Sequence, residues 1–116
     1  MVAYPVEIVI AESDEAAHRI ARAAYEVYQA NIQHLWHSWF VHDLRVGHEY
    51  DAMVRAGAMI AGAPATVQDI IGRQLERLPL DYFVLNMKWG NLSAAQSLRT
   101  LELFTTKVRP GLAERR

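Results

Sequence analysis

Two short apolar runs limit the folds open to this chain more than any other feature of its sequence. Residues 6–11 read Val-Glu-Ile-Val-Ile-Ala, and residues 82–87 read Tyr-Phe-Val-Leu-Asn-Met. Short runs that are nearly continuously apolar and rich in β-branched or aromatic residues are typical of strands buried on both faces of a parallel sheet. A helical pattern follows each run. The sequence therefore predicts a mixed α/β fold with parallel strands.

A long helix is expected after the first strand. Apolar residues recur at three- and four-residue spacing from about residue 13 to about residue 40, which gives one apolar stripe. Ser13 is placed to cap this helix, and Asp14 and Glu15 lie in its first turn, where carboxylates favour the positive end of the helix dipole. The following stretch, 41–62, carries only a weak helical pattern interrupted by glycines.

Two more helices are expected around the second strand. Pro64 suits the first turn of a helix that runs over about 64–78. Ser93 and Gln96 form the capping box of the final helix, which is expected to end at Pro110. The core stripe of that final helix is predicted to consist of Leu98, Leu101, Phe104 and Val108.

The composition indicates an ordered, soluble domain. A chain of 116 residues with 52% apolar residues suits one packed domain. The net charge of −1 leaves no basic surface for nucleic acid or for membrane lipids. Without cysteine, disulfides and cysteine-based zinc sites are excluded. The sequence shows no signal-peptide pattern and no window near the roughly 18 apolar residues that span a bilayer, so a cytoplasmic location is expected.

Three motifs in the C-terminal half occur in the same order as in a known enzyme family. They are the helix start Gly-Ala-Pro-Ala-Thr-Val at 62–67, the apolar strand at 82–87 with the Trp-Gly turn behind it, and a helix with Glu-Leu-Phe at 102–104 that ends in Val-x-Pro at 108–110. With these motifs, residues 62–110 resemble the C-terminal end of the bacterial luciferase-like flavin-dependent monooxygenases.

The resemblance implies both a fold and an activity. Enzymes of this family are (β/α)8 barrels, which run to roughly 250 residues or more. It therefore implies that residues 1–116 are a single, helix-rich α/β domain: a partial (β/α)8 barrel made of the last two strands with their helices, parallel and adjacent. The implied activity is oxidation of a small organic substrate with dioxygen and reduced flavin, with FMN as the first choice and a deazaflavin in some relatives. The isolated chain is expected to be an incomplete piece of such an enzyme.

The same resemblance assigns cofactor-binding residues. In the family, the turn after the last strand borders the flavin and substrate pocket, which implies roles there for Lys88, Trp89 and Gly90. Trp89 would form an aromatic wall, Gly90 would let the backbone approach closely, and Lys88 would supply positive charge. A structural alternative stays open, in which Trp89 packs under the last helix and Gly90 forms a left-handed turn. No catalytic residue is assigned.

Two further patterns carry weaker signals for a ligand. The helix start before Pro64 follows a glycine, as anion sites do, but proline removes one N–H donor, and a structural helix start is favoured. His34 and His37 lie one helical turn apart, near His42 and His48. Because a catalytic zinc site needs three ligands and no third one is fixed by spacing, the sequence predicts no metal site.

A second function class stays open beside the enzyme. In it, the chain is a non-catalytic α/β module that associates with itself or with a partner that supplies the rest of a barrel. Trp36, Trp39 and Phe40 cluster at one helix end and would form the contact patch, unless they pack on their own chain. Open strand edges also favour a homo-oligomer.

Overall fold

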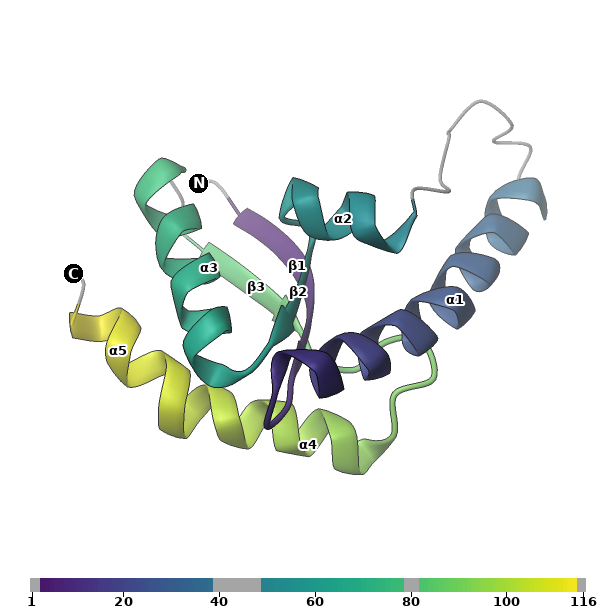
Figure 1. Cartoon of the computed structure of the whole chain (residues 1–116). Helices are drawn as coiled ribbons and strands as arrows, with labels where there is room; N and C mark the ends of the chain where they lie inside the picture. Colours follow the sequence, from purple (N-terminus) through teal and green to yellow (C-terminus); the bar gives the residue numbers. More distant parts are fainter. Residues whose placement is uncertain (1–2, 39–48, 79–81, 115–116) are drawn as a thin grey trace.

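Three parallel strands form one small sheet in the computed structural model of this chain (Figure 1). The structure describes residues 3–38, 49–78 and 82–114, and gives the backbone alone for 3–4, 35–38 and 82. The strands are β1 (Ala3–Ile10), β2 (Met59–Gly62) and β3 (Tyr82–Asn86). Their order in the sheet is β2-β1-β3, so the first strand of the chain is the central one.

The central strand pairs with its two neighbours over different parts of its length. Against β2, the pairs run from Glu7↔Met59 to Ile10↔Gly62. Against β3, they run from Ala3↔Tyr82 to Glu7↔Asn86. Both pairings are parallel, which confirms the prediction that the two apolar runs are adjacent parallel strands. The offset leaves the last residues of β1 paired on the β2 side only.

The third strand and the strand order differ from the expected partial barrel. The sequence predicts no strand at 59–62, because four apolar residues that end in glycine show neither the length nor the alternation that separates a strand from a helical segment. In a (β/α)8 barrel, each strand lies beside the next one along the chain, whereas here β3 lies beside β1 rather than β2. The mixed α/β, helix-rich class is confirmed. The described residues form three strands rather than the predicted two, and they give no evidence of a (β/α)8 barrel.

The helices begin and end close to the predicted positions. The long first helix follows β1, and the hydroxyl of Ser13 accepts a hydrogen bond from the amide of Ala16 at 3.1 Å, as expected of a cap. No helix in the described ranges combines the length and the apolar character needed to cross a bilayer. The first three helices are α1 (Asp14–Ser38), α2 (Tyr50–Ala56) and α3 (Pro64–Arg77).

The C-terminal helix continues past Pro110, where the sequence predicts its end. Its parts are α4 (Ala94–Leu103), the π-helical segment η1 (Phe104–Val108) and α5 (Arg109–Glu114). In η1, the hydroxyls of Thr105 and Thr106 donate to the carbonyl of Glu102 at 3.1 and 2.7 Å. The wider π turn places Pro110 in the first turn of α5, where a missing N–H is tolerated. The proline therefore does not end the helix.

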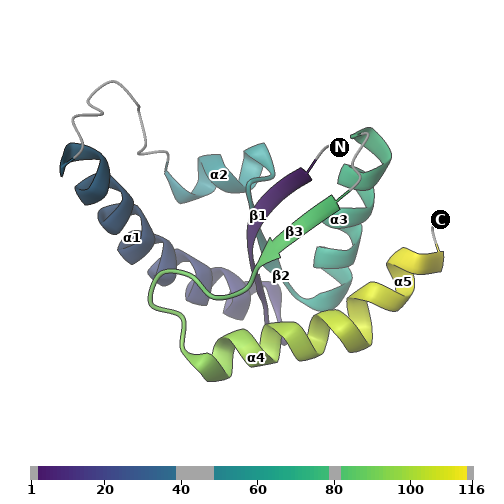
Figure 2. The same ribbon diagram turned by 180° about the vertical axis from the view of Figure 1, so that it is seen from behind.

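The helices cover both faces of the sheet. One face packs against α1, α2 and the loop behind β3, and the other packs against α3, α4 and η1 (Figures 1 and 2). Alternate residues of β1 point to opposite faces, so its side chains divide between two cores. The first core contains Val9, Ala11, Ala17, Ala21, Ala24, Tyr25, Tyr50, Met59, Ala61, Trp89 and Leu92. The second contains Val6, Ile8, Ile10, Ile60, Val67, Ile71, Leu103 and Val108.

The buried face of α4 is rotated from the predicted one. Leu98 and Leu101 are 64% and 45% exposed, so their prediction as core residues is wrong. Thr100 and Leu103 are the buried residues of this helix. Thr100 turns inward because its hydroxyl bonds the main chain of β1, which hydrophobic periodicity cannot reveal.

Candidate functional site

The carboxyl ends of β1 and β3 meet at one edge of the sheet, where their following helices separate. After β1 the chain enters α1 on one face, and after β3 it enters α4 on the other (Figure 2). In open α/β sheets, ligands bind in the crevice outside the carboxyl ends of the strands, at the point where neighbouring connections leave to opposite faces. This edge is therefore the candidate functional site.

Side chains complete β1 where β3 has already ended. The last β3 pair is Glu7↔Asn86, so the carbonyl of Ile8 and the main-chain groups of Ile10 on that side lie beyond the strand pairing. The indole N–H of Trp89 donates to the carbonyl of Ile8 at 3.4 Å. The hydroxyl of Thr100 accepts from the amide of Ile10 at 3.1 Å and donates to its carbonyl at 3.3 Å. Side chains thus satisfy the buried polar groups of β1 that lie beyond the end of β3.

Two of the three predicted flavin-binding residues pack closely against α1. Trp89 is 5% exposed, and its ring meets the ring of Tyr28 edge-on with 5.9 Å between centroids. Gly90 has a φ of 57°, and a Cβ at this position would collide with the carbonyl of Ala24. Gly90 forms the left-handed turn of the structural alternative, whereas Trp89 packs against α1 rather than under the last helix. They hold the loop behind β3 against α1.

Lys88 is the predicted residue whose side chain faces solvent at this edge. Its side chain is exposed, and its ammonium donates a hydrogen bond to the carbonyl of Leu92. An ammonium carries three donors, so two N–H groups remain for an anionic ligand. Asn91, also exposed, lies in the same loop.

A guanidinium joins the loop behind β1 to α4. Arg99 donates through Nε to a carboxylate oxygen of Glu12 at 2.8 Å, and its Nη1 lies 3.1 Å from a carboxylate oxygen of Glu102. The hydrogen bond from Arg99 holds the pKa of Glu12 below its ordinary value. No local sequence pattern indicates this pair, because its members are 87 positions apart. Arg99, Glu12 and Glu102 therefore place one positive and two negative charges at this edge.

Asp14 occupies the N-terminus of α3. Its carboxylate accepts hydrogen bonds from the amide of Ala63 at 2.7 Å and from the hydroxyl of Thr66 at 3.0 Å. These bonds, the one from Ala63 first, lower the pKa of Asp14. A Cβ on Gly62 would lie 2.9 Å from the same carboxylate, which explains the glycine. The favoured structural helix start agrees with this geometry, since the chain's own carboxylate takes the place of an external anion.

A polar cluster on α1 and α2 is likewise not indicated by any local sequence pattern. Nδ1 of His18 lies 2.8 Å from the hydroxyl of Tyr50, and the guanidinium of Arg22 lies over the Tyr50 ring at 4.6 Å. Arg22 also pairs with Asp51 at 3.0 Å. Burial, the largest cause, raises the pKa of Tyr50 to about 12. The phenol therefore stays protonated at neutral pH, and its contacts with His18 and Arg22 tie α2 to α1.

The histidine and aromatic clusters fall mostly outside the described residues. His34 is exposed on α1, while the side chain of His37 and the whole of His42 and His48 lie beyond what the structure describes. The same holds for the side chain of Trp36 and for residues 39–40. Within the described ranges, no group of three or more histidine, aspartate or glutamate side chains is placed to hold a metal ion.

Comparison with known proteins adds no family assignment. No model of a known protein family matches the chain, and a search of curated proteins finds no match either.

Proposed function

We propose that this chain is the flavin-binding piece of a flavin-dependent monooxygenase or related oxidoreductase. Reduced FMN is the favoured cofactor, a deazaflavin is the alternative, and the substrate is a small organic molecule oxidised with dioxygen. The cofactor binds at the carboxyl edge, between the loops behind β1 and β3. A second polypeptide segment, from a partner or from another copy of the chain, completes the site, as the resemblance to luciferase-like enzymes implies.

The relation between β1 and β3 carries this proposal. The described strands have the order β2-β1-β3. Some doubly wound sheets of the order 2-1-3-4-5 bind FMN at the switch point between the first and third strands. The resemblance in the C-terminal half and this strand order point to the same ligand class by separate routes. The proposal therefore does not depend on barrel closure.

The residues at this edge fit an anionic cofactor in part. The Lys88 ammonium is exposed and keeps donors for an anionic group, whereas Trp89 and Gly90 are occupied by Ile8, Tyr28 and Ala24. Lys88 would therefore hold the cofactor, and Trp89 would position the loop that carries it. A bound reduced flavin would supply the electrons of the reaction, while the protein binds, orients and excludes water.

Titration of FMN, followed by quenching of its fluorescence, tests the proposal. Wild-type protein should quench the flavin, and Lys88→Gln should bind it about tenfold more weakly, since one charge-assisted hydrogen bond is lost. Lys88→Arg keeps the charge and should retain most of the affinity. Arg19→Gln, which removes an exposed charge on α1, is the matched control. Absence of quenching, or equal affinity of the Lys88→Gln protein, would contradict the proposed site.

Exposed apolar side chains favour a second candidate function, a non-catalytic self-association or partner-binding module. Leu98 and Leu101 lie one turn apart on α4 and are largely exposed, and Val84 on β3 is 48% exposed. In the described sheet, β2 and β3 each pair on one side only. Exposed apolar residues and strand edges of this kind favour association. Self-association without flavin binding would support this candidate over the enzyme.

A further inference from the structure

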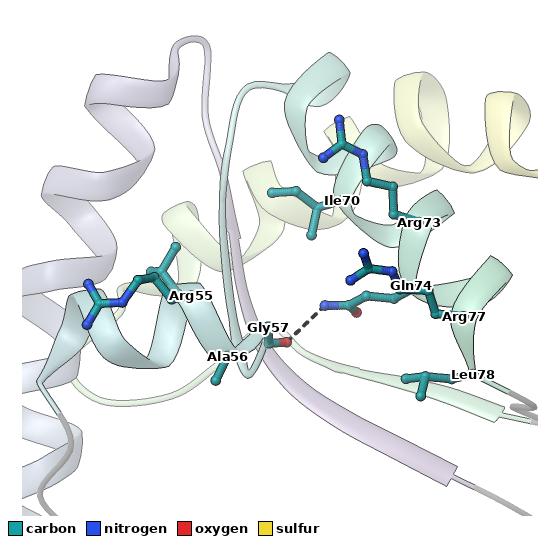
Figure 3. A pocket seen from close by; sticks show the side chains of 9 residues that line it. Arg55, Ala56, Gly57, Ile70, Arg73, Gln74, Arg77 and Leu78 are labelled. Carbon is teal, nitrogen blue, oxygen red and sulfur yellow. Dashed lines mark hydrogen bonds between the residues drawn. The ribbon is translucent and has the colours of Figure 1, made fainter.

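A pocket of about 450 Å³ lies at the opposite edge of the sheet from the proposed flavin site. It is formed by the end of α2, the turn that leads into β2, and the C-terminal half of α3 (Figure 3). It faces the amino end of β2, whereas the flavin proposal concerns the carboxyl ends of β1 and β3. A ligand here would be separate from the cofactor, and the inference stands without the proposed function.

Arginine dominates the charge of the pocket. Arg55 comes from α2, while Arg73 and Arg77 come from α3. Because Arg73 and Arg77 are four positions apart, they share one face of the helix. In Figure 3, the Arg77 side chain extends toward Gln74, and the Arg73 side chain extends beside Ile70. None of the described residues that line the pocket is acidic. The arginines therefore leave a positive surface in a recess.

Asp69, which forms an ion pair with Arg73, does not neutralise the positive charge of the pocket. Asp69 pairs with Arg73 at 2.8 Å, but both side chains are well exposed, at 46% and 70%. An exposed pair within one helix contributes only about 0.3–0.5 kcal/mol. An anion that reaches two guanidiniums in the recess can therefore compete with it, because Arg presents several N–H donors to an oxyanion at once.

Gln74 supplies an independent sign of a missing ligand group. Its Nε2 donates to the carbonyl of Gly57 at 3.1 Å, which fixes the orientation of the amide. Its Oε1 is buried and has no hydrogen-bond partner in the described part of the chain. A buried acceptor left unpaired is costly, so such atoms are usually satisfied by water or by a ligand. Because this oxygen has almost no exposed surface, a ligand O–H or N–H group would meet this need only after the Gln74 side chain turns toward the pocket.

The remaining wall is apolar. Val54, Ala56, Ile70 and Leu78 line the pocket beside the charged groups. From these observations we infer that the pocket binds a small organic phosphate. The phosphate lies between Arg73 and Arg77, and the apolar body packs on Ile70 and its neighbours. The Gln74 side chain turns toward the ligand, so that a hydroxyl or amine on that body donates to its Oε1. Inorganic phosphate would satisfy the arginines alone.

The test is an NMR titration of ¹⁵N-labelled protein with 4-aminophenyl phosphate, which carries a phosphate, an apolar ring and an N–H donor. Signals of Gly57, Ile70 and the Gln74 side-chain amide should shift. The double variant Arg73→Gln with Arg77→Gln should weaken binding at least about tenfold, because charge-assisted hydrogen bonds are lost. Both side chains are exposed, so the fold should survive. Arg19→Gln is the matched control and should bind as the wild type does.

Several results would overturn the inference. One is the absence of any shift up to about 10 mM probe, an affinity too weak for a site. Equal binding of 4-aminophenol would show that the phosphate contributes nothing, and equal binding of inorganic phosphate would show the same of the apolar wall. Unchanged binding by the double variant would show that Arg73 and Arg77 do not bind the probe. Since FMN also carries a phosphate, the double variant belongs in the flavin titration: unchanged FMN affinity there separates the two sites.

Discussion

The hydroxyl of Thr100 forms two hydrogen bonds with the main chain of Ile10, which lies 90 positions earlier. One bond is accepted from the amide and the other is donated to the carbonyl, at 3.1 and 3.3 Å. Thr100 is 2% exposed. On the β3 side of β1, where strand pairing ends at Glu7, a helix side chain thereby takes the place of a neighbouring strand. The same bonds join α4 to the centre of the sheet.

Replacement of this hydroxyl by a methyl group should destabilise the protein. Thr100→Val keeps the volume but leaves the amide and carbonyl of Ile10 without partners, at a cost of about 1–3 kcal/mol. Urea denaturation measures the change, and Thr100→Ser, which keeps the hydroxyl, should lose less. Thr105→Val, at an exposed position of the same helix, is the control. A Thr100→Val protein as stable as the control would show that water satisfies the strand edge.

Loss of Trp89 should act on stability rather than on flavin affinity. Its ring packs on Tyr28 and its N–H bonds the carbonyl of Ile8, so Trp89→Ala should cost about 3–5 kcal/mol, as expected of a buried aromatic residue. Thermal denaturation and flavin titration on the same variant decide the matter. A stable variant whose flavin affinity falls by about 1–3 kcal/mol would instead restore Trp89 as a wall of the cofactor pocket.

Gly90 should tolerate no side chain. Gly90→Ala combines a positive φ with a collision against the backbone carbonyl of Ala24, so it should lose more than the roughly 1 kcal/mol that a left-handed alanine costs by itself. Gly111→Ala is the matched control, because its Cβ meets only the end of the flexible Gln68 side chain and alanine favours a helix. Equal melting temperatures of the two variants would contradict the close approach of Gly90 to α1.

Acid should weaken the link between Asp14 and the start of α3. The bonds from Ala63 and Thr66 hold the pKa of Asp14 below its ordinary value. The unfolded chain therefore takes up a proton at this site first, and the stabilisation is complete above about pH 3.9 and is lost as the pH falls through the lower pKa of the folded state. Melting temperatures recorded from pH 5 downward, a range chosen about the aspartate value, should fall less steeply for Asp14→Asn than for wild type. Glu15→Gln, an exposed neighbour, should follow the wild-type curve. Parallel curves for Asp14→Asn and wild type would refute the link.

The free chain should associate. The exposed pair Leu98 and Leu101 and the open strand edges favour burial against another surface. Light scattering should give a mass above the 13.2 kDa of one chain, and Leu98→Gln with Leu101→Gln should shift the mass toward the monomer. A sharp monomer for wild type, without a rise in mass at high concentration, would count against self-association.

The sequence predicted the position of the candidate loop, but it did not predict the roles of the residues in it. The loop at Lys88, Trp89 and Gly90 follows a strand and therefore lies at the carboxyl edge, as predicted. Which side chain is free for a ligand depends on α1, since Tyr28 packs on Trp89 and the carbonyl of Ala24 lies against Gly90. Those contacts join residues more than 60 positions apart, and no local pattern encodes them.

Local chemistry determined the elements of this protein, and tertiary packing determined their relations. The cap at Ser13 and the capping box of Ser93 with Gln96 were predictable, because each depends on residues three positions apart. The inward turn of Thr100, the bonds of Asp14 to α3 and the order β2-β1-β3 were not. Apolar periodicity reports that a face is buried, but not against what. Hydrogen bonds between distant segments become available only when the sheet brings their partners together.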